Sequence, residues 1–302
     1  LDETGRSILR ASAQVDDRNN ISADDLLKAI PDYDGLIVRG RTKVTAAVME
    51  AASKLKVIGR AGVGVDNIDL EAAKKHNITV VNAPMSTTLA VAELTFGLML
   101  ALAREIPRAD AGMKQGKWLK KELEGAEMNG KTLGVIGFGR IGMELGKRAA
   151  AFGMSVVAYD PLISEDEIAK RGAEPVSIQD LYAWSDFISL HVPRNVQTRD
   201  MIGPLAFSQM KNGARIVCAA RGGSIDEAAL VAALNSGKVA GAALDVYAVE
   251  PPGETEAVLH PKVIAMPHIG AQTAEAQSRA SEDISNEVLS ALLDKPLRWK
   301  VN

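Results

Sequence analysis

One stretch constrains the fold of this chain more than any other, "KTLGVIGFGRIGMELGKRAAAFGMSVVAYDP" at residues 131–161. An apolar run enters a turn that contains Gly137, Gly139 and Gly142, and apolar side chains then recur at helical spacing. A second apolar run follows and ends at Asp160. A strand, a glycine turn, a helix and a strand in this order form a βαβ unit, whose two strands run parallel in one sheet.

The same alternation continues along most of the chain. Short runs rich in β-branched residues alternate with amphipathic helical segments, which predicts parallel sheets with crossover helices. In the first part we expect strands at residues 35–40, 55–60 and 77–83. In the second part we expect six strands, at residues 132–137, 155–160, 186–192, 214–220, 241–246 and 262–267. The predicted fold class is therefore α/β, with two doubly wound parallel-sheet domains.

Three helical segments carry further information. Ser22 is expected to cap a helix at residues 22–30, and Thr45 is expected to cap the helix that follows it. The segment at residues 86–104 is apolar nearly all round, and such a helix must be covered on several sides. Either it is central to its domain, or it packs against a second subunit.

The last helical segment, residues 274–293, brings no strand of its own, so we expect it to pack back onto the first domain. The chain would then pass between domains near Pro84 and near Gly270, and a cleft with two hinges is a natural ligand site. A doubly wound domain normally opens with a strand, whereas this chain opens with a helical segment at Leu1, so a first strand is expected to be missing. The predicted domains are residues 1–83 with 272–302, and residues 84–271.

Composition excludes several classes of protein. The 302 residues suffice for two domains, and 47% hydrophobic with 24% charged residues is typical of a soluble globular protein. A net charge of −3 gives no electrostatic reason to bind nucleic acid or an anionic membrane. Cys218 is the only cysteine and lies in an apolar run, which predicts a buried strand residue and neither a disulfide nor a metal site. The longest apolar stretch is interrupted by Glu93 and is short for a membrane span, so a cytoplasmic location is expected.

The glycine turn predicts a dinucleotide site. Gly137 permits the tight turn, Gly139 lets the backbone approach a pyrophosphate, and Gly142 lets the helix pack closely on the strand. The N–H groups at the start of the helix suit a phosphate. Asp160 ends the second strand, where a carboxylate accepts hydrogen bonds from ribose hydroxyls and repels a 2′-phosphate. The predicted cofactor is therefore NAD rather than NADP, bound in a Rossmann-type domain.

Three ionisable residues, Arg221, Glu250 and His268, each follow an expected strand, where α/β sheets bind their ligands. Oxidation of a 2-hydroxy acid needs a base for the hydroxyl proton while the hydride leaves for NAD, and histidine titrates at about 6.5. Glu250 would orient the ring and stabilise its charged form, and Arg221 would bind the substrate carboxylate. A single histidine in such a place is more often structural, but the three residues together favour catalysis.

The other histidines and a second glycine loop have weaker patterns. His191 ends an expected strand and is predicted to line the cofactor pocket, whereas His76 and His260 are predicted to be bystanders. The loop "GRAGVGVDN" lacks the third glycine and the downstream acid of a nucleotide site. We therefore expect this loop to face the substrate, with Val63 and Gly64 in contact with the substrate.

Several motifs together resemble the D-isomer-specific 2-hydroxyacid dehydrogenases: "LIVRGRTKVT", "GRAGVGVDNIDL", "NGKTLGVIGFGRIG", "AARGGSIDEAAL", "AALDVYAVEPP" and "PHIGAQTAEAQ". The resemblance covers essentially the whole chain and is greatest for the family's phosphoglycerate enzymes. It implies a Rossmann-type NAD-binding domain inserted into a flavodoxin-like substrate domain, and a homodimer or homotetramer in which the helix at 86–104 belongs to the interface. The family's second strand would fall on "AQVDDRNN", which is unusually polar.

The resemblance also assigns roles to matching positions. Arg221, Glu250 and His268 are the catalytic set. The residues implied in NAD binding are Gly137, Gly139, Arg140, Ile141, Gly142, Asp160, His191, Val192, Pro193, Ala219, Ala220, Arg221, Asp245, His268 and Ala271. Arg39 and Arg60 are implied to hold a substrate phosphate, with Lys120 contributed by the partner subunit. From the residues alone, Arg39, Arg41 and Lys43 form either an anion site after a strand or a solvated basic loop.

The predicted function is NAD-dependent oxidation of 3-phosphoglycerate to 3-phosphohydroxypyruvate, the first step of serine biosynthesis. A glyoxylate or hydroxypyruvate reductase, or another D-2-hydroxyacid dehydrogenase, is the alternative among enzymes. The alternative from another class is a NAD-sensing binding protein that resembles the C-terminal-binding corepressors. These also keep the arginine, glutamate and histidine, so the motifs alone do not exclude it.

Overall fold

The computed structural model describes residues 1–302, which form two compact units. Unit 1 comprises Leu1–Ala90 and Ala271–Asn302, and unit 2 comprises Val91–Gly270. Unit 2 is thus inserted into the chain of unit 1. The first crossing between the units falls inside a long helix, α5 (Thr88–Ala103), and residues 84–90 belong with unit 1.

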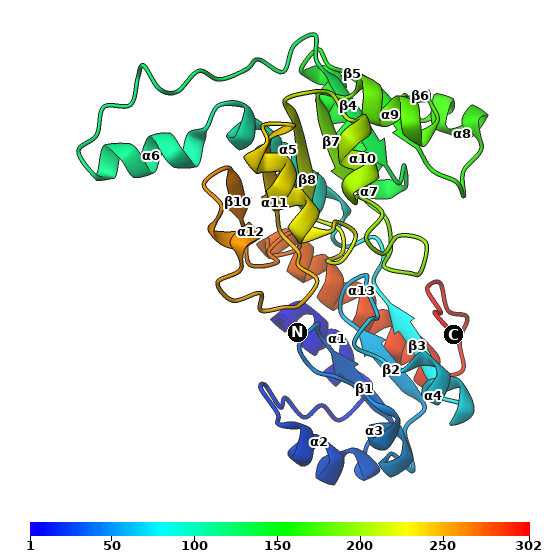
Figure 1. Cartoon of the computed structure of the whole chain (residues 1–302). Coiled ribbons are helices and arrows are strands. Elements are labelled where there is room, and N and C mark those ends of the chain that lie inside the picture. Colours follow the sequence, from blue (N-terminus) through cyan, green and yellow to red (C-terminus); the bar gives the residue numbers. More distant parts are fainter. The chain divides into compact units, whose positions relative to one another are not determined.

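Unit 1 is built on a sheet of three parallel strands in the order β1-β2-β3 (Figure 1). The strands are β1 (Gly35–Val38), β2 (Val57–Arg60) and β3 (Thr79–Asn82). Its helices are α1 (Glu3–Arg10), α2 (Ala23–Ala29), η1 (Ile30–Asp32), α3 (Ala46–Ala51), α4 (Leu70–Lys75) and α13 (Ala274–Leu292). All three expected strands are present. Residues 13–20, the polar segment, form no strand.

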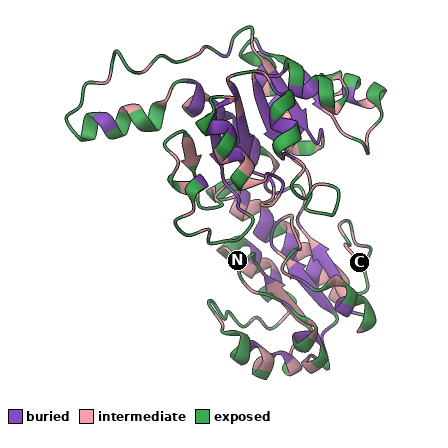
Figure 2. Cartoon of the chain, in the orientation of Figure 1, coloured by how far each residue is buried: buried purple, intermediate pink, exposed green.

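Helices cover both faces of this sheet because successive strand residues point to opposite sides. Ile58 packs with residues of α2, α3 and α4. Its neighbour Val57 packs on the other face with Ile284 and Val288 of α13. Most of β2 and the middle of β3 are accordingly buried, whereas most of β1 is half-buried (Figure 2). The tail helix therefore packs onto the first unit as predicted.

The two predicted helix caps differ in strength. Ser22 caps α2, and its hydroxyl accepts a hydrogen bond from the Asp25 N–H at 3.1 Å. Thr45 occupies the N-cap position of α3 with extended backbone, but its side chain makes no capping hydrogen bond. The predicted helix start at Thr45 is thus present without the predicted side-chain contact.

Unit 2 contains a sheet of seven strands in the order β10-β9-β8-β7-β4-β5-β6, and every adjacent pair is parallel. Read from β6, this is the Rossmann order with one added strand, β10. The strands are β4 (Thr132–Ile136), β5 (Ser155–Tyr159), β6 (Glu174–Pro175), β7 (Phe187–Leu190), β8 (Ala214–Cys218), β9 (Val239–Leu244) and β10 (Val263–Ala265). The six expected strands are all present. The additional strand, β6, has only two residues and so produces no apolar run in the sequence.

Helices also cover both faces of the larger sheet. One face packs on α5, α7 (Arg140–Ala151) and α8 (Glu165–Lys170), and the other on α9 (Ile178–Trp184), α10 (Pro204–Gln209) and α11 (Glu227–Asn235). The remaining helices are α6 (Ile106–Lys114) and α12 (Glu256–Leu259). The helix α6 and the segment after it project from the rest of unit 2 (Figure 1). No helix has both the length and the apolar character needed to cross a membrane.

Candidate active site

The strands β8, β9 and β10 lie side by side and run parallel, so the loops that follow them start at one edge of the sheet. Arg221, Glu250 and His268 lie in these three loops. The His268 Nδ1 is 2.7 Å from the Glu250 Oε2, and the Glu250 Oε1 accepts a hydrogen bond from the Tyr247 N–H at 3.1 Å. The structure therefore brings the predicted histidine and carboxylate into direct contact.

The two side chains change each other's protonation. The hydrogen bond to Glu250 raises the pKa of His268 above its ordinary value, and this outweighs the opposing effect of burial. Burial acts to raise the pKa of Glu250, but the hydrogen bonds from His268 and from the Tyr247 N–H outweigh it and lower this pKa. Both shifts favour an imidazolium paired with a carboxylate.

Asp245 holds the backbone next to His268. Its carboxylate is fully buried and accepts hydrogen bonds from the Ile269 N–H at 2.8 Å and the Gly270 N–H at 2.7 Å. Burial raises the pKa of this carboxyl, although the two N–H groups oppose the shift. His268 itself has a left-handed backbone (φ 55°), which few residues with side chains adopt. Asp245 fixes the residues immediately after this unusual turn.

Arg221 lies in a loop that packs closely against the loop of Glu250. A Cβ on Gly222 would lie 1.7 Å from the Tyr247 carbonyl oxygen, so only glycine fits there. The Arg221 Nη1 donates to the Ala220 carbonyl at 2.8 Å. Its charge acts to lower the pKa of both Glu250 and His268. Arg221 is therefore part of the same electrostatic environment as the histidine–glutamate pair.

The glycine turn after β4 has the expected close contacts. Gly137 has φ 90°, and a Cβ there would lie 2.6 Å from the His191 carbonyl oxygen. A Cβ on Gly142 would lie 2.5 Å from the Gly137 carbonyl oxygen, so α7 packs directly on the turn. A Cβ on Gly139 would meet nothing within 4 Å, which leaves the N-terminus of α7 open to a ligand.

Asp160 and His191 flank this turn. The two carboxylate oxygens of Asp160 accept hydrogen bonds at 2.9 Å from the N–H groups of Phe138 and Leu162. The His191 Nε2 is 2.9 Å from the Ser189 Oγ, whereas its Nδ1 is buried and has no partner within the protein. Burial lowers the pKa of His191 to about 4. A buried polar atom beside a turn open to a ligand fits a bound dinucleotide.

The predicted substrate residues Arg39, Arg60, Val63 and Gly64 all belong to unit 1. Arg39 follows β1 and Arg60 ends β2, so both lie at the carboxyl edge of the sheet in unit 1, where Val63 and Gly64 also follow β2. Lys120 lies in the segment that follows α6 in unit 2. His76 is the C-cap residue after α4, and His260 is half-buried, with its Nε2 3.3 Å from Asn235 Oδ1.

Cys218 ends β8 and is buried, as predicted, and burial raises the pKa of its thiol to about 11. Sequence reasoning missed two contacts around the site. The Tyr247 hydroxyl lies within hydrogen-bonding distance of the Leu244 and Met266 carbonyls, which joins the ends of β9 and β10. The Ala248 N–H donates to the Glu227 carboxylate at 2.9 Å. The contacts of Tyr247 with Met266 and of Ala248 with Glu227 join residues 19 and 21 positions apart, so no local sequence pattern predicts them.

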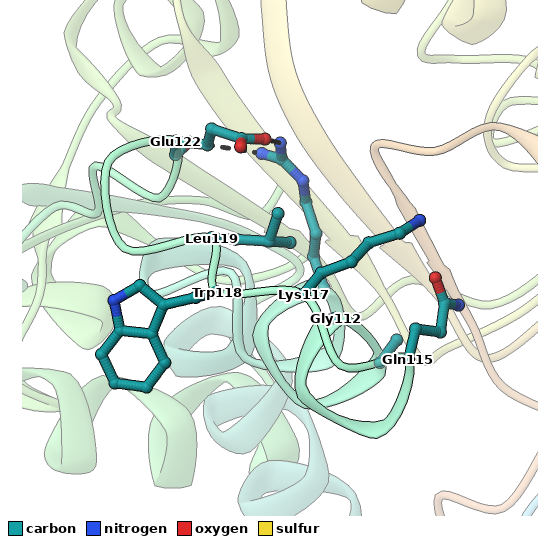
Figure 3. Close-up of a pocket in the computed structure, with 8 residues that line it drawn as sticks. Gly112, Gln115, Lys117, Trp118, Leu119 and Glu122 are labelled. Atoms are coloured by element: carbon teal, nitrogen blue, oxygen red, sulfur yellow. Dashed lines mark hydrogen bonds and ion pairs between the residues drawn. The ribbon is translucent and has the colours of Figure 1, made fainter.

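A cavity of about 660 Å³ lies elsewhere in unit 2, along α6 and the segment that follows it (Figure 3). In this view Trp118 points away from α6, and the Glu122 carboxylate lies 3.5 Å from the Arg108 guanidinium. The lining residues are Arg108, Ala111, Gly112, Gln115, Lys117, Trp118, Leu119 and Glu122. None of them is a predicted site residue. The candidate active site is therefore identified by the residues at the strand ends, and this cavity is not part of it.

Residues 96–270 match the family model for the D-isomer specific 2-hydroxyacid dehydrogenase, NAD binding domain. The chain belongs to this family. The match confirms the predicted family and the assignment of NAD to unit 2. The strand order and the solved relatives confirm the predicted fold class.

Curated relatives match this chain over nearly its whole length. It is 47% identical to D-3-phosphoglycerate dehydrogenase of Rattus norvegicus over 303 residues, which cover 100% of this chain and 57% of that protein. It is 49% identical to D-3-phosphoglycerate dehydrogenase of Methanocaldococcus jannaschii over 97% of this chain and 56% of that protein. The chain thus spans little more than half the length of these curated relatives. A solved glyoxylate reductase from Paecilomyes thermophila superposes with a TM-score of 0.90 and 32% identity, covering 98% of this chain and 94% of that one.

Replacing Glu250 by Gln should lower the pKa of His268 toward its ordinary value of 6.5, because the substitution removes the carboxylate charge that raises it. A raised folded-state pKa adds stability below the unfolded-state pKa, and this stability is lost as pH rises through the folded-state pKa. The variant should therefore lose stability mainly in acid solution. NMR titration of the histidine ring signals, with His268→Gln to assign them, measures the shift directly.

The exposed Glu254 provides a matched control in the same loop. Glu254→Gln removes one carboxylate near the site without touching the ring, so the pKa of His268 should stay where it is. An unchanged His268 titration in Glu250→Gln would contradict the assigned cause of the shift.

Proposed function

We propose that this chain carries the catalytic part of a NAD-dependent D-2-hydroxyacid dehydrogenase that oxidises 3-phosphoglycerate to 3-phosphohydroxypyruvate, the first step of serine biosynthesis. The contact of 2.7 Å between His268 and Glu250 is the observation that carries the proposal. The choice of substrate is supported by the names of relatives at 47% and 49% identity.

The residues of the glycine turn, Asp160 and His191 would hold NAD in unit 2. When bound, NAD supplies the hydride acceptor. Because the His268 Nδ1 is engaged by Glu250, its Nε2 is the nitrogen left to take the hydroxyl proton of the substrate. His268 would take the hydroxyl proton and become an imidazolium, which Glu250 stabilises, while the hydrogen on the same carbon leaves with its bonding electrons as hydride and the C–O bond becomes a carbonyl. The raised pKa of His268 supports this role because it makes the ring a stronger base.

Arg221 would bind the substrate carboxylate, since a guanidinium offers a fixed pair of donors to two carboxylate oxygens. Arg39 and Arg60, at the carboxyl ends of neighbouring strands of unit 1, are proposed to hold the distal phosphate, with contacts from Val63 and Gly64. Lys120 would be contributed by a partner subunit. The remaining NAD contacts would come from Arg140, Ile141, Val192, Pro193, Ala219, Ala220, Asp245 and Ala271.

A substrate panel tests the proposed reaction. With NAD, the rate with 3-phosphoglycerate should exceed the rates with glycerate and lactate, and Arg39→Ala should raise KM for the phosphorylated acid alone. The exposed Lys54 of the same unit provides a control, and Lys54→Ala should leave KM unchanged. Equal rates with and without the phosphate would contradict the substrate. They would favour a glyoxylate or hydroxypyruvate reductase, in line with the solved glyoxylate reductase at 32% identity.

Replacing His268 by Ala should lower kcat by about 10²–10⁴-fold, the usual scale of acid–base assistance. The affinity for NADH should change far less than kcat, since the glycine turn and Asp160 keep their proposed contacts with the dinucleotide. Steady-state kinetics with NADH titration separate the two effects, and His260→Ala, at a histidine outside the proposed site, is the control. A near-normal kcat in His268→Ala would remove the proposed proton carrier. A wild-type chain that binds NADH and turns over no acid would favour the NAD-sensing binding protein.

We also propose that the protein assembles as a homodimer or homotetramer. Exposed apolar side chains on α6 and the following segment support this, since Met113 is 57% and Trp118 is 75% exposed on an arm that projects from unit 2. Sedimentation should give a multiple of the 32.0 kDa chain mass, and Trp118→Glu should shift the protein toward smaller species. A single species of 32.0 kDa at micromolar concentration would contradict this proposal.

A further inference from the structure

Arg171 contacts the glycine turn from a distant part of the chain. It follows α8, and its Nη1 donates a hydrogen bond to the Phe138 carbonyl oxygen at 3.0 Å. Its Nε donates to the Glu167 Oε1 at 2.9 Å, one helical turn earlier. A partly exposed ion pair at this spacing contributes little by itself. The contact with Phe138 is the feature that an ordinary surface pair does not explain.

Phe138 lies between Gly137 and Gly139, and it is held from two sides. Its N–H donates to the Asp160 Oδ2 at 2.9 Å, while its carbonyl accepts from Arg171. Its side chain is fully buried in the core of unit 2. Glycine neighbours leave a backbone segment free to rotate, so a segment that must keep one orientation needs external contacts of this kind.

The orientation of one peptide group follows from the Arg171 contact. The Phe138 carbonyl and the Gly139 N–H belong to the same planar trans peptide, so they point in opposite directions. Fixing the carbonyl toward Arg171 therefore fixes the Gly139 N–H on the other side, at the N-cap of α7. The first N–H groups of a helix lack partners within it and suit a phosphate. A charged donor on the carbonyl also polarises the amide and strengthens its N–H as a donor.

We propose that Arg171 is a positioning residue for the NAD pyrophosphate, acting by holding the peptide between Phe138 and Gly139 in the orientation that presents the Gly139 N–H. Arg171 does not itself contact the cofactor. The inference rests on NAD binding at this turn, and it does not depend on which 2-hydroxy acid is the substrate.

Replacing Arg171 by Leu should weaken NADH binding on the order of tenfold, the scale of one charge-assisted hydrogen bond. The dissociation constant, measured by calorimetry or NADH fluorescence, gives this effect without turnover. The KM for NAD should rise while kcat at saturating NAD stays nearly unchanged. Arg171→Lys should restore part of the affinity, because an ammonium can reach the carbonyl without the guanidinium fork. Lys170→Leu is the control, since it removes one positive charge from the same exposed end of α8.

Competition with ADP and with adenosine separates positioning from general loosening. ADP carries a pyrophosphate, so Arg171→Leu should raise its inhibition constant as it does for NADH. Adenosine lacks phosphate, so its inhibition constant should stay the same. Equal losses for ADP and adenosine, or unchanged NADH binding in Arg171→Leu, would overturn the inference. A wild-type chain that binds NADH but oxidises no 2-hydroxy acid would contradict the proposed reaction alone, and the role of Arg171 would still be supported by the binding measurements.

Discussion

Parallel pairing of strands is the constraint on which the rest of this structure depends. Strands that run the same way deliver all of their following loops to one edge of the sheet, so residues far apart in the sequence meet there. The loops after β8, β9 and β10 bring Arg221 and the His268–Glu250 pair into one electrostatic environment. The loop after β4 and the end of β5 likewise join the glycine turn to Asp160. The direction of the strands alone therefore brings together the residues of each of these two sites.

Four ionisable groups of unit 2 have different pKa shifts because their surroundings differ. His268 gains a carboxylate partner, which raises its pKa, whereas desolvation of the half-buried His191 lowers its pKa to about 4. Asp245 is buried more deeply than Glu250, and its pKa is raised rather than lowered. Its two backbone hydrogen bonds nevertheless suit it to holding the chain after His268 in place. One fold thus places a histidine paired with a carboxylate beside a second carboxylate that fixes the neighbouring backbone.

The sequence predicted the elements that leave a local pattern. The β-branched runs located both sheets, and the spacing of glycines located the turn before α7. The strand β6 was not predicted because two residues make no periodicity. Thr45 has the expected extended backbone at the start of α3, but its side chain makes no capping hydrogen bond. Arg171 could not be found in this way, since its contact with Phe138 joins residues 33 positions apart through a backbone carbonyl. Hydrogen bonds to the main chain across elements carry no residue-type preference that a sequence pattern would reveal.

The insertion of unit 2 has a consequence for how the chain becomes organised. Unit 1 needs α13 from the far end of the sequence to cover one face of its sheet, and the long intervening segment would make that encounter entropically costly in a random coil. Gly270 nevertheless lies against Val91, because a Cβ on the glycine would be 3.3 Å from the Val91 Cγ2. Folding of the inserted unit therefore draws its own entry and exit together. The folded unit 2 thereby shortens the effective loop between the two chain segments that make up unit 1, residues 1–90 and 271–302.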